Sequence, residues 1–259
     1  QPVVVALSRL AQLMFSVLWH RQARWFRLDP MKTLAELRLA AQLPPGPGGD
    51  AVKPGVEVTL DRWRYLGQFF HTGAQVGLAI SSSLDAQREW LHRHQPAYLF
   101  SYPGSMEELA FDTSTEPLPT SVEVLIAGGA STTPHMERRI ETGFGLPVNQ
   151  VYGMNELGRV AVRCPMGRFH VHPETVVAEV LRDDDEPCRP GETGRVVLTG
   201  VRNFVMPLLR YDTGDMAEWL GDEPCPCGRT RPALGAIAGR FRRFAGLPDG
   251  TRERFQVLR

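Results

Sequence analysis

A regular alternation of helical and extended segments between residues 85 and 152 most limits the folds open to this chain. Short apolar runs predict buried strands, and the segments between them carry helical patterns and helix-capping residues. This alternation favours a parallel sheet with right-handed crossover connections. The predicted elements are helices over 85–94, 105–111 and 133–142, and strands over 97–101, 122–127 and 148–152.

After residue 156 the pattern changes to strands alone, separated by turn signals such as Pro190-Gly191. The predicted strands are 160–163, 169–171, 175–181, 194–198 and 207–211. We therefore predict an α/β protein, in which a parallel-sheet α/β part is followed by a smaller antiparallel β-sheet or barrel. The change near residue 156 indicates a shift within one compact unit rather than a linker.

The first 55 residues are less regular. We expect the end of a strand at 3–5, a helix over 6–26 and a Pro/Gly-rich loop over 43–55. The most apolar stretch, 3–19, is broken by Ser8, Arg9 and Gln12, and no run reaches the roughly 20 residues that span a bilayer. The sequence therefore predicts a cytoplasmic protein with no membrane partner.

The charges of the chain balance, because 29 basic and 29 acidic residues give a formal net charge of zero. A protein that tracks phosphates along a nucleic acid needs a broad basic surface. We therefore expect no nucleic-acid partner, although a local basic patch stays compatible with this composition.

Three glycine-containing turns follow predicted strands, at Gly128-Gly129, at Tyr152-Gly153 and at Tyr211-Asp-Thr-Gly-Asp215. Ligands of parallel α/β sheets bind at the carboxyl ends of the strands, where glycine lets the backbone approach the ligand closely. Each turn taken alone is equally compatible with an ordinary tight connection. Their combination is more informative.

These turns belong to a series of motifs that follow one another in order between residues 95 and 240. The motifs are Ser101-Tyr-Pro-Gly-Ser-Met-Glu-Glu-Leu-Ala, Ala127-Gly-Gly-Ala-Ser-Thr, Val151-Tyr-Gly-Met-Asn-Glu-Leu-Gly, Pro190-Gly-Glu-Thr-Gly-Arg, Met206-Pro-Leu-Leu-Arg-Tyr-Asp-Thr-Gly-Asp, Cys225-Pro-Cys-Gly-Arg and Gly239-Arg240. In this order and spacing the sequence resembles the adenylate-forming superfamily, and within it the phenylacetate–coenzyme A ligases with their capsular-polysaccharide-biosynthesis relatives. The resemblance implies the N-terminal domain fold of those enzymes. It also implies that a carboxylic acid, first guessed to be an aryl acid, is joined to the α-phosphate of ATP and passed to coenzyme A.

The same resemblance assigns a nucleotide site. Tyr152 matches the residue whose ring packs against adenine, since its flat face is apolar. Gly128 and Gly129 would let the other side of the base approach the main chain. Asp215 matches the aspartate that accepts hydrogen bonds from both ribose hydroxyls, and Arg240 lies where the family has a nucleotide-contacting arginine.

Glu156 matches the catalytic glutamate of the family that is linked to magnesium. A hard carboxylate suits Mg²⁺, which neutralises phosphate charge. Ala130, Gly153 and Asn155 belong to the same motifs and are included in the expected cofactor-binding set.

The spacing of the cysteines indicates a metal site. Three thiolates and one imidazole fit tetrahedral Zn²⁺, and closed sites with four ligands are structural rather than catalytic. His172 is an alternative histidine ligand, three unlinked thiols are the alternative to a site, and Cys188 has no evident partner. The predicted ligands are Cys164, His170, Cys225 and Cys227.

The resemblance stops at both ends of the chain. The family carries a Ser/Thr/Gly-rich phosphate loop just before the position where this sequence begins, and a mobile C-terminal domain that supplies a lysine and rotates between half-reactions. We expect this mobile domain to be largely absent here. The intact motifs favour missing segments over a truncated, non-catalytic relative. The expected division is 1–156 for the α/β part that binds the nucleotide and the acyl group, 157–240 for the β-rich part with zinc, and 241–259 for the hinge and the remnant of the C-terminal domain.

Three hypotheses for the function follow. The first is a ligase for a small-molecule carboxylic acid that uses ATP and coenzyme A, with a homodimer as a further expectation from related ligases. The second keeps adenylation but changes the acceptor to an amine or a carrier-protein thiol. The third is a nucleotide-binding or zinc-stabilised module without catalysis, since a fold does not determine a function.

Overall fold

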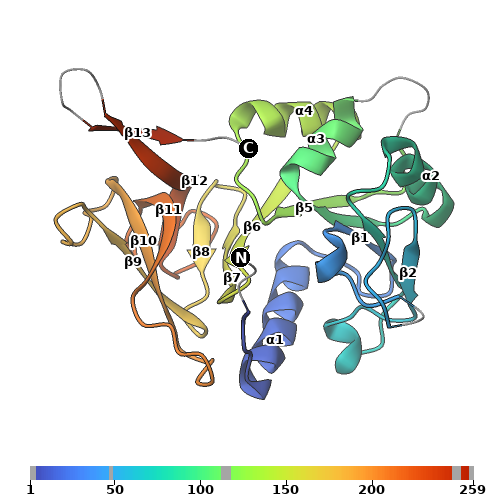
Figure 1. Cartoon of the computed structure of the whole chain (residues 1–259), viewed down its shortest axis with the longest axis horizontal. Coiled ribbons are helices and arrows are strands. Elements are labelled where there is room, and N and C mark those ends of the chain that lie inside the picture. The colour runs from blue at the N-terminus through green and yellow to red at the C-terminus, as the bar shows by residue number, and fades with distance from the viewer. Residues whose placement is uncertain (1–3, 47–48, 112–117, 247–251, 257–259) are drawn as a thin grey trace. The chain divides into compact units, whose positions relative to one another are not determined.

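A computed structural model describes the backbone of residues 4–46, 49–111, 118–246 and 252–256 and, within these ranges, the side chains up to residue 239 (Figure 1). The chain divides into two compact units. We call Phe15–Gln150 the α/β unit, and Gln1–Met14 with Val151–Arg259 the β-rich unit.

Five strands of the α/β unit follow one another in the order β2-β3-β1-β4-β5 and belong to a larger sheet. β1 runs parallel to β3 and β4, and β4 runs parallel to β5, whereas β2 is antiparallel to β3. The carboxyl ends of β1, β4 and β5 therefore lie at one edge of the sheet. The strands are β1 Leu34–Arg38, β2 Glu57–Leu60, β3 Gln75–Ala79, β4 Tyr98–Ser101 and β5 Val124–Gly128.

Two helices of this unit, α2 and α4, have clear capping residues. Ser83 and Thr133 accept hydrogen bonds from backbone amides in the first turns of α2 and α4, and Gly145 ends α4 in the left-handed conformation. α3 and α4 lie side by side (Figure 1), and a Cβ at Gly143 would come within 2.5 Å of Ala110. The helices are α1 Arg9–Trp25, α2 Leu84–His94, α3 Pro103–Phe111 and α4 Pro134–Phe144, and the short 3-10 turns are η1 Ala40–Gln42 and η2 Leu66–Gln68.

The β-rich unit is antiparallel. Its strand order is β6-β7-β8-β12-β11-β10-β9, and β13 pairs with β12. Residues such as Val160, Val196 and Leu234 form an apolar core between these strands. The strands are β6 Val148–Met154, β7 Gly158–Arg163, β8 Phe169–Val171, β9 Val176–Leu181, β10 Thr193–Gly200, β11 Tyr211–Trp219, β12 Ala233–Gly246 and β13 Arg252–Gln256.

The predicted fold class is confirmed, and several element boundaries are corrected. The predicted strand over 207–211 is wrong, because Arg210 has a φ of 47° and the strand begins at Tyr211. α1 begins at Arg9 instead of residue 6, residues 4 and 5 are not extended into a strand, and Val3 lies outside the described residues. α2 begins at Leu84, one residue before the predicted start, and Ser83 caps it.

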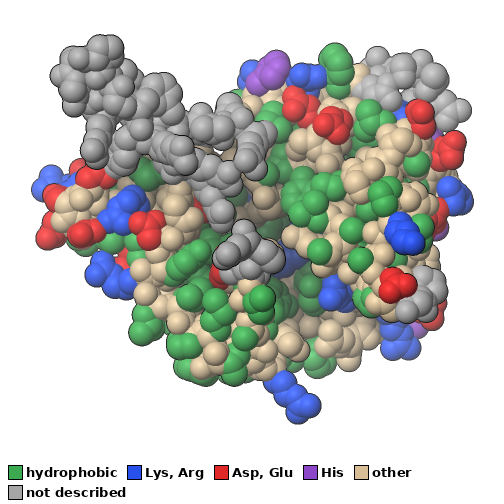
Figure 2. All heavy atoms as spheres, in the orientation of Figure 1, with side chains coloured by type: hydrophobic (Ala, Val, Ile, Leu, Met, Phe, Trp, Pro, Cys, Tyr) green, Lys and Arg blue, Asp and Glu red, His purple; other side chains and the backbone are tan. Residues whose placement is uncertain are grey.

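The distribution of charge on the surface and the character of the helices agree with the balanced charge and the broken apolar stretches of the sequence. Acidic and basic side chains lie intermingled on the face of the described residues that Figure 2 shows. In the part of the chain that the structure describes, no helix combines the length and apolar character needed to cross a membrane.

Candidate functional site

The Gly128-Gly129 turn lies at the carboxyl end of β5 in the α/β unit. Gly128 is buried and Gly129 is exposed, with a φ of 83° that L-residues rarely adopt. A Cβ at Gly129 would lie 2.7 Å from Cε1 of Tyr102, so the tyrosine ring packs directly on this glycine. Both the backbone conformation and this contact require glycine here.

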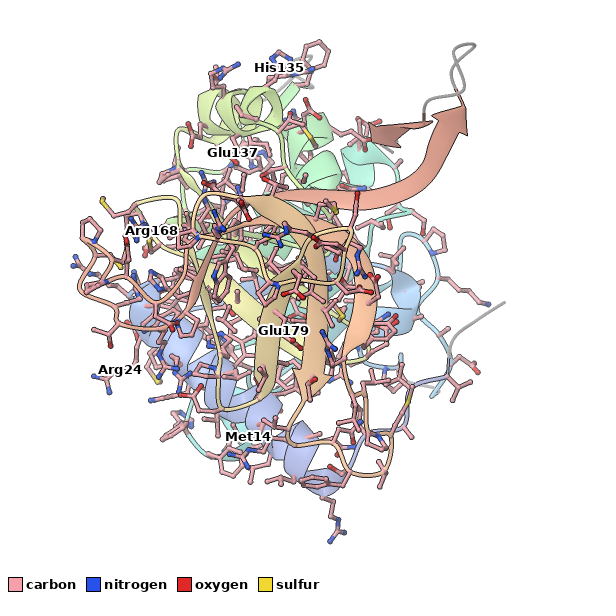
Figure 3. The ribbon with its side chains drawn as sticks, turned by 90° about the vertical axis from the view of Figure 1, so that its left-hand side faces the viewer. Met14, Arg24, His135, Glu137, Arg168 and Glu179 are labelled. Atoms are coloured by element: carbon pink, nitrogen blue, oxygen red, sulfur yellow. The ribbon has the colours of Figure 1, made fainter. Side chains whose placement is uncertain are left out.

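The loop after the turn is tied down by Glu137, in the first turn of α4 (Figure 3). Its carboxylate Oε1 accepts hydrogen bonds from Oγ1 of Thr132, at 2.8 Å, and from the side-chain amide of Gln150 in β6. Ala130, which belongs to the expected cofactor-binding set, is exposed in this loop. The sequence interpretation missed Glu137, although an acidic residue in the first turn of a helix after a Gly-Gly motif was a usable signal.

Tyr152 and Asp215 meet in the β-rich unit. The Tyr152 hydroxyl donates a hydrogen bond to Oδ2 of Asp215 at 2.8 Å, although 63 positions separate them in sequence. The Asp215 side chain is buried, at 8% exposure, and its backbone amide donates to Oγ1 of Thr213 at 3.1 Å. The structure therefore brings together two residues that were assigned to one nucleotide site from separate motifs.

A β-bulge at Tyr152 and Gly153 sets the direction of the tyrosine. The pairing of β6 with β7 shifts register between these two residues, and a Cβ at Gly153 would lie 2.5 Å from the carbonyl oxygen of Gly158. Asn155 and Glu156 follow in the turn that joins the two strands, where Asn155 is exposed and Glu156 is half-buried. The role of Glu156 with magnesium stays a prediction.

Arg240 is opposite Asp215 in the register of β11 and β12. Its side chain lies outside the described residues, so its contact with a nucleotide also stays a prediction. The expected nucleotide-site residues fall in both units. Gly128, Gly129 and Ala130 belong to the α/β unit, and Tyr152, Gly153, Asn155, Asp215 and Arg240 belong to the β-rich unit.

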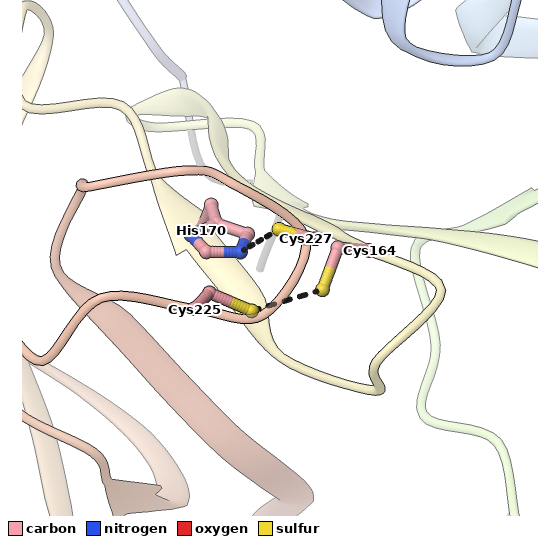
Figure 4. A group of neighbouring side chains, drawn as sticks. All are labelled: Cys164, His170, Cys225 and Cys227. Atoms are coloured by element: carbon pink, nitrogen blue, oxygen red, sulfur yellow. Dashed lines mark hydrogen bonds between the residues drawn. The ribbon is translucent and has the colours of Figure 1, made fainter.

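The predicted metal ligands converge in the β-rich unit (Figure 4). The ligand atoms of Cys164, His170, Cys225 and Cys227 all lie within 4.8 Å of one another. Sγ of Cys164 is 3.8 Å from Sγ of Cys225, and Sγ of Cys227 is 3.3 Å from Nε2 of His170. Three sulfur donors and one imidazole nitrogen are a donor set that suits zinc.

Two loops with one pattern hold the cysteines. Cys164-Pro-Met-Gly-Arg and Cys225-Pro-Cys-Gly-Arg have the same Cys-Pro-x-Gly-Arg sequence. In each loop the cysteine amide donates to the arginine carbonyl four positions on, at 2.8 Å for Arg168 (labelled in Figure 3) and 3.1 Å for Arg229. The sequence interpretation did not use this repeat, which would have shown that Met166 takes the place of a second cysteine in the first loop.

The pKa shifts of two of the four residues, His170 and Cys227, favour the forms that bind metals, whereas that of Cys225 favours the thiol. Burial, and then the charge of Arg229, lowers the pKa of His170, so its ring tends to be neutral. Burial acts to raise the pKa of Cys227, but hydrogen bonds from the Arg229 backbone and from neighbouring side chains lower it to about 7. Burial raises the pKa of Cys225. Neutral imidazole and thiolate are the forms that bind metals.

His172 and Cys188 lie outside this cluster. Both are buried, and the four-residue group found among the described residues includes neither. Cys188 belongs to the apolar core of the β-rich unit, and a Cβ at Gly194 would lie 2.5 Å from its sulfur. This position fits a packing role.

Comparison with known sequences gives one family match and matches to several phenylacetate-coenzyme A ligases. A family described as AMP-binding enzyme matches residues 64–207, which is more than half of the chain. A phenylacetate-coenzyme A ligase of Thermus thermophilus is 32% identical over 145 residues, covering 54% of this chain and 32% of that protein. A phenylacetate-coenzyme A ligase of Escherichia coli is 25% identical over 181 residues, covering 65% of this chain and 40% of that protein.

Solved structures share the fold. A 2-hydroxyisobutyryl-CoA ligase in complex with 2-HIB-AMP and CoA has a TM-score of 0.72 at 17% identity, covering 98% of this chain and 58% of that chain. A benzoate CoA ligase from Burkholderia xenovorans has a TM-score of 0.61 at 14% identity, covering 89% of this chain and 45% of that chain. The chain thus spans 32% to 40% of the curated relatives named above.

Proposed function

Because this chain belongs to the AMP-binding enzyme family, we propose that its protein activates a carboxylic acid with ATP and transfers the acyl group to coenzyme A. The observation that carries this proposal is the hydrogen bond between Tyr152 and Asp215. Two motifs that the resemblance assigns to adenine and ribose are joined by it in the folded chain. A ring and a carboxylate held together in this way suit a nucleoside, which offers a flat base next to two hydroxyl groups.

The proposed reaction has two steps. In the first, a carboxylate oxygen of the acid attacks the α-phosphorus of ATP, and pyrophosphate leaves. In the second, the coenzyme A thiol attacks the acyl carbon as a thiolate, the bond to AMP breaks, and the thioester forms. The role proposed for this chain is binding and orientation, which can supply a large part of such a rate enhancement.

Individual residues have distinct roles in this proposal. The ring of Tyr152 packs on adenine, and Asp215 accepts from the ribose hydroxyls. Gly129 lets the nucleotide approach the backbone at the edge of the α/β sheet. Glu156 would hold Mg²⁺, which offsets the charge of the phosphates when bound.

An aryl acid is the first candidate substrate. The curated relatives are named for phenylacetate, and this supports the choice without deciding it. Phe69 and Phe70 are 55% and 50% exposed, so neither is a core residue and both are candidates for contact with an aryl group. His71 is also exposed, and the ring of Phe70 stacks on His20 at 5.0 Å between centroids.

A structural zinc ion is the proposed occupant of the four-residue cluster. The donor types fit, and the ion would join the two Cys-Pro-x-Gly-Arg loops without taking part in the reaction. Elemental analysis of the purified protein tests this independently of activity. About one zinc per chain supports the site, and no bound metal after purification without chelators contradicts it.

Carboxylate-dependent ATP–pyrophosphate exchange on the complete protein tests the proposed activity. A panel of aryl, fatty and amino acids is compared in the wild type, in Asp215→Ala and in the control Asp212→Ala. Asp212 is exposed and pairs with Arg195 at 2.6 Å, three positions from Asp215. We expect exchange with at least one acid class, lost in Asp215→Ala and kept in the control.

The outcomes separate the competing functions. Exchange followed by thioester formation with coenzyme A supports the proposal. Exchange without thioester formation would move the acceptor to an amine or a carrier-protein thiol. ATP binding without exchange for any acid would identify a non-catalytic relative.

A further inference from the structure

Arg38 ends β1 between two aromatic rings of the α/β unit. Its guanidinium carbon lies 4.4 Å from the ring centroid of Phe100 and 4.5 Å from that of Tyr102. Both distances are in the range of cation–π contacts. The aromatic residues come from β4 and from the position just after it, so the cation is fixed by the neighbouring strand.

Both rings lie within cation–π distance of the guanidinium carbon, but a ring face offers no oxygen acceptor for the N–H groups. Nη1 of Arg38 is buried and makes no hydrogen bond within the part of the chain that the structure describes. The residue as a whole is half-buried, so part of Arg38 is exposed although Nη1 is not. A guanidinium is a permanent cation with five N–H donors in its plane, and a buried donor without an acceptor is unfavourable. The missing partner is therefore expected to be an oxygen acceptor.

Tyr102 is itself held in place. Its hydroxyl donates a hydrogen bond to Oε1 of Gln42, and the backbone oxygen of Gln42 accepts from Nη1 of Arg64 at 3.2 Å. The ring also packs on Gly129. The arginine therefore lies in a fixed position, which favours recognition of a planar group with two oxygens.

The position of Arg38 in the sheet separates it from the reacting end of the proposed substrate. β1, β4 and β5 are consecutive parallel strands, so Arg38, Tyr102 and Gly129 follow one another along a single edge. Adjacent strands are about 4.8 Å apart, which places the end of β1 about 10 Å from the end of β5. The nucleotide is proposed to lie at Gly129, and adenylation takes place beside it. The Tyr102 ring contacts both the Arg38 guanidinium and Gly129, so a group held by Arg38 lies about one aromatic ring away from the reacting end.

We propose that Arg38 binds a second, non-reacting carboxylate of the acid substrate, so that the substrate class is dicarboxylic. This inference rests on the proposed function for the identity of the reaction. Arg38 is then a specificity-determining residue. A carboxylate supplies an oxygen acceptor of the kind that Nη1 lacks, and its second oxygen can accept from the same planar guanidinium.

The test compares two acids that differ by one carboxymethyl group. Phenylacetate and 1,4-phenylenediacetate are assayed by ATP–pyrophosphate exchange in the complete protein, in Arg38→Met and in Arg38→Lys. The methionine keeps most of the stem, and the lysine keeps the charge without the fork. Arg139→Met is the matched control, because Arg139 also lies over a ring, 4.2 Å from the centroid of Phe111, but is paired with Glu107 at 3.3 Å.

We expect the wild type to favour 1,4-phenylenediacetate in kcat/KM. Arg38→Met should lower this preference between about tenfold and a hundredfold, the range for a hydrogen bond to a charged group. Arg38→Lys should restore part of it, and the control should keep it. An equal loss for both acids, an effect on the KM for ATP alone, or no wild-type preference would overturn the proposal.

A direct binding measurement separates this inference from the proposed function. If the wild type shows no exchange with any acid, calorimetric titration with 1,4-phenylenediacetate in the absence of ATP still examines the site. Binding that is lost in Arg38→Met and kept in Arg139→Met supports the carboxylate site even when the ligase activity is refuted. No binding by the wild type rejects it.

Discussion

The hydrogen bond between Tyr152 and Asp215 predicts a measurable energetic coupling. Tyr152→Phe removes the hydroxyl and keeps the ring, so Asp215 loses a donor that lies 2.8 Å from Oδ2. Hydrogen bonds to charged groups contribute about 1.5–3 kcal/mol. Asp215 has further contacts beyond this one, so we expect a loss near the lower end, about 1.5 kcal/mol in the free energy of unfolding. This is roughly a tenfold change in the ratio of folded to unfolded protein.

A double-mutant cycle measured by urea denaturation isolates this bond. The cycle consists of Tyr152→Phe, Asp215→Ala and the double variant. We expect the sum of the two single-variant losses in unfolding free energy to exceed the loss of the double variant by about 1 kcal/mol. Tyr211→Phe is the control, because it makes the same chemical change in β11 and should stay within about 0.5 kcal/mol of the wild type.

The reasoning would be refuted by additive losses in the cycle. A coupling below about 0.5 kcal/mol would mean that the hydroxyl and the carboxylate do not meet in solution. A control variant as destabilised as Tyr152→Phe would mean that the loss of any tyrosine hydroxyl has this effect. Either result would remove the observation on which the proposed nucleotide site depends.

The remaining predictions concern the metal cluster and the Gly128-Gly129 turn. Cys225→Ser should reduce bound zinc from about one ion per chain to nearly none by elemental analysis, whereas Cys188→Ala should keep it. The apparent zinc affinity should fall as the pH drops below about 7, because the Cys227 thiolate, whose pKa is about 7, then takes up a proton; chelator competition at about pH 8 and about pH 6 measures this. Gly129→Ala should cost at least about 1 kcal/mol more than Gly145→Ala in urea denaturation. Both glycines have a positive φ, but open space surrounds the Cβ position of the second.

Each of these predictions has a clear contrary result. Full zinc occupancy in Cys225→Ser would show that the four residues do not act as one site. A chelator competition curve that is flat across this pH range would mean that no ligand titrates there. Equal destabilisation of the two glycine variants would show that Tyr102 is not in contact with residue 129 in solution.

The strands of the α/β unit differ in how well the sequence predicts them. β5, which ends at the Gly128-Gly129 turn, is apolar and contains β-branched residues, and its predicted bounds lie within two residues of the observed ones. β1 was missed because its sequence Leu-Ala-Glu-Leu-Arg consists of good helix formers. Pairing with β3 and β4 on both sides forces the extended conformation, and this non-local pairing outweighs local propensity.

The candidate site was predictable only in part for a related reason. The spacing of Cys225, Cys227, Cys164 and His170 was enough to propose one group, since their loops are short and their pattern is specific. Arg38 could not be singled out, because its partners lie more than sixty positions away and meet it only through the register of β1 and β4. The contacts that depend on sheet register are those that the sequence alone does not reveal.

The β-bulge at Tyr152 has a consequence for how binding and folding are linked. At the proposed nucleotide site the Tyr152 ring is held in place without a ligand, since the bulge sets its backbone and Asp215 accepts a hydrogen bond from its hydroxyl. The entropy of immobilising this side chain is therefore lost during folding and not again on association. A substitution that loosens the tight approach of Gly153 to Gly158 would return that entropic cost to the binding step. Nucleotide affinity would then decline in a protein that still folds.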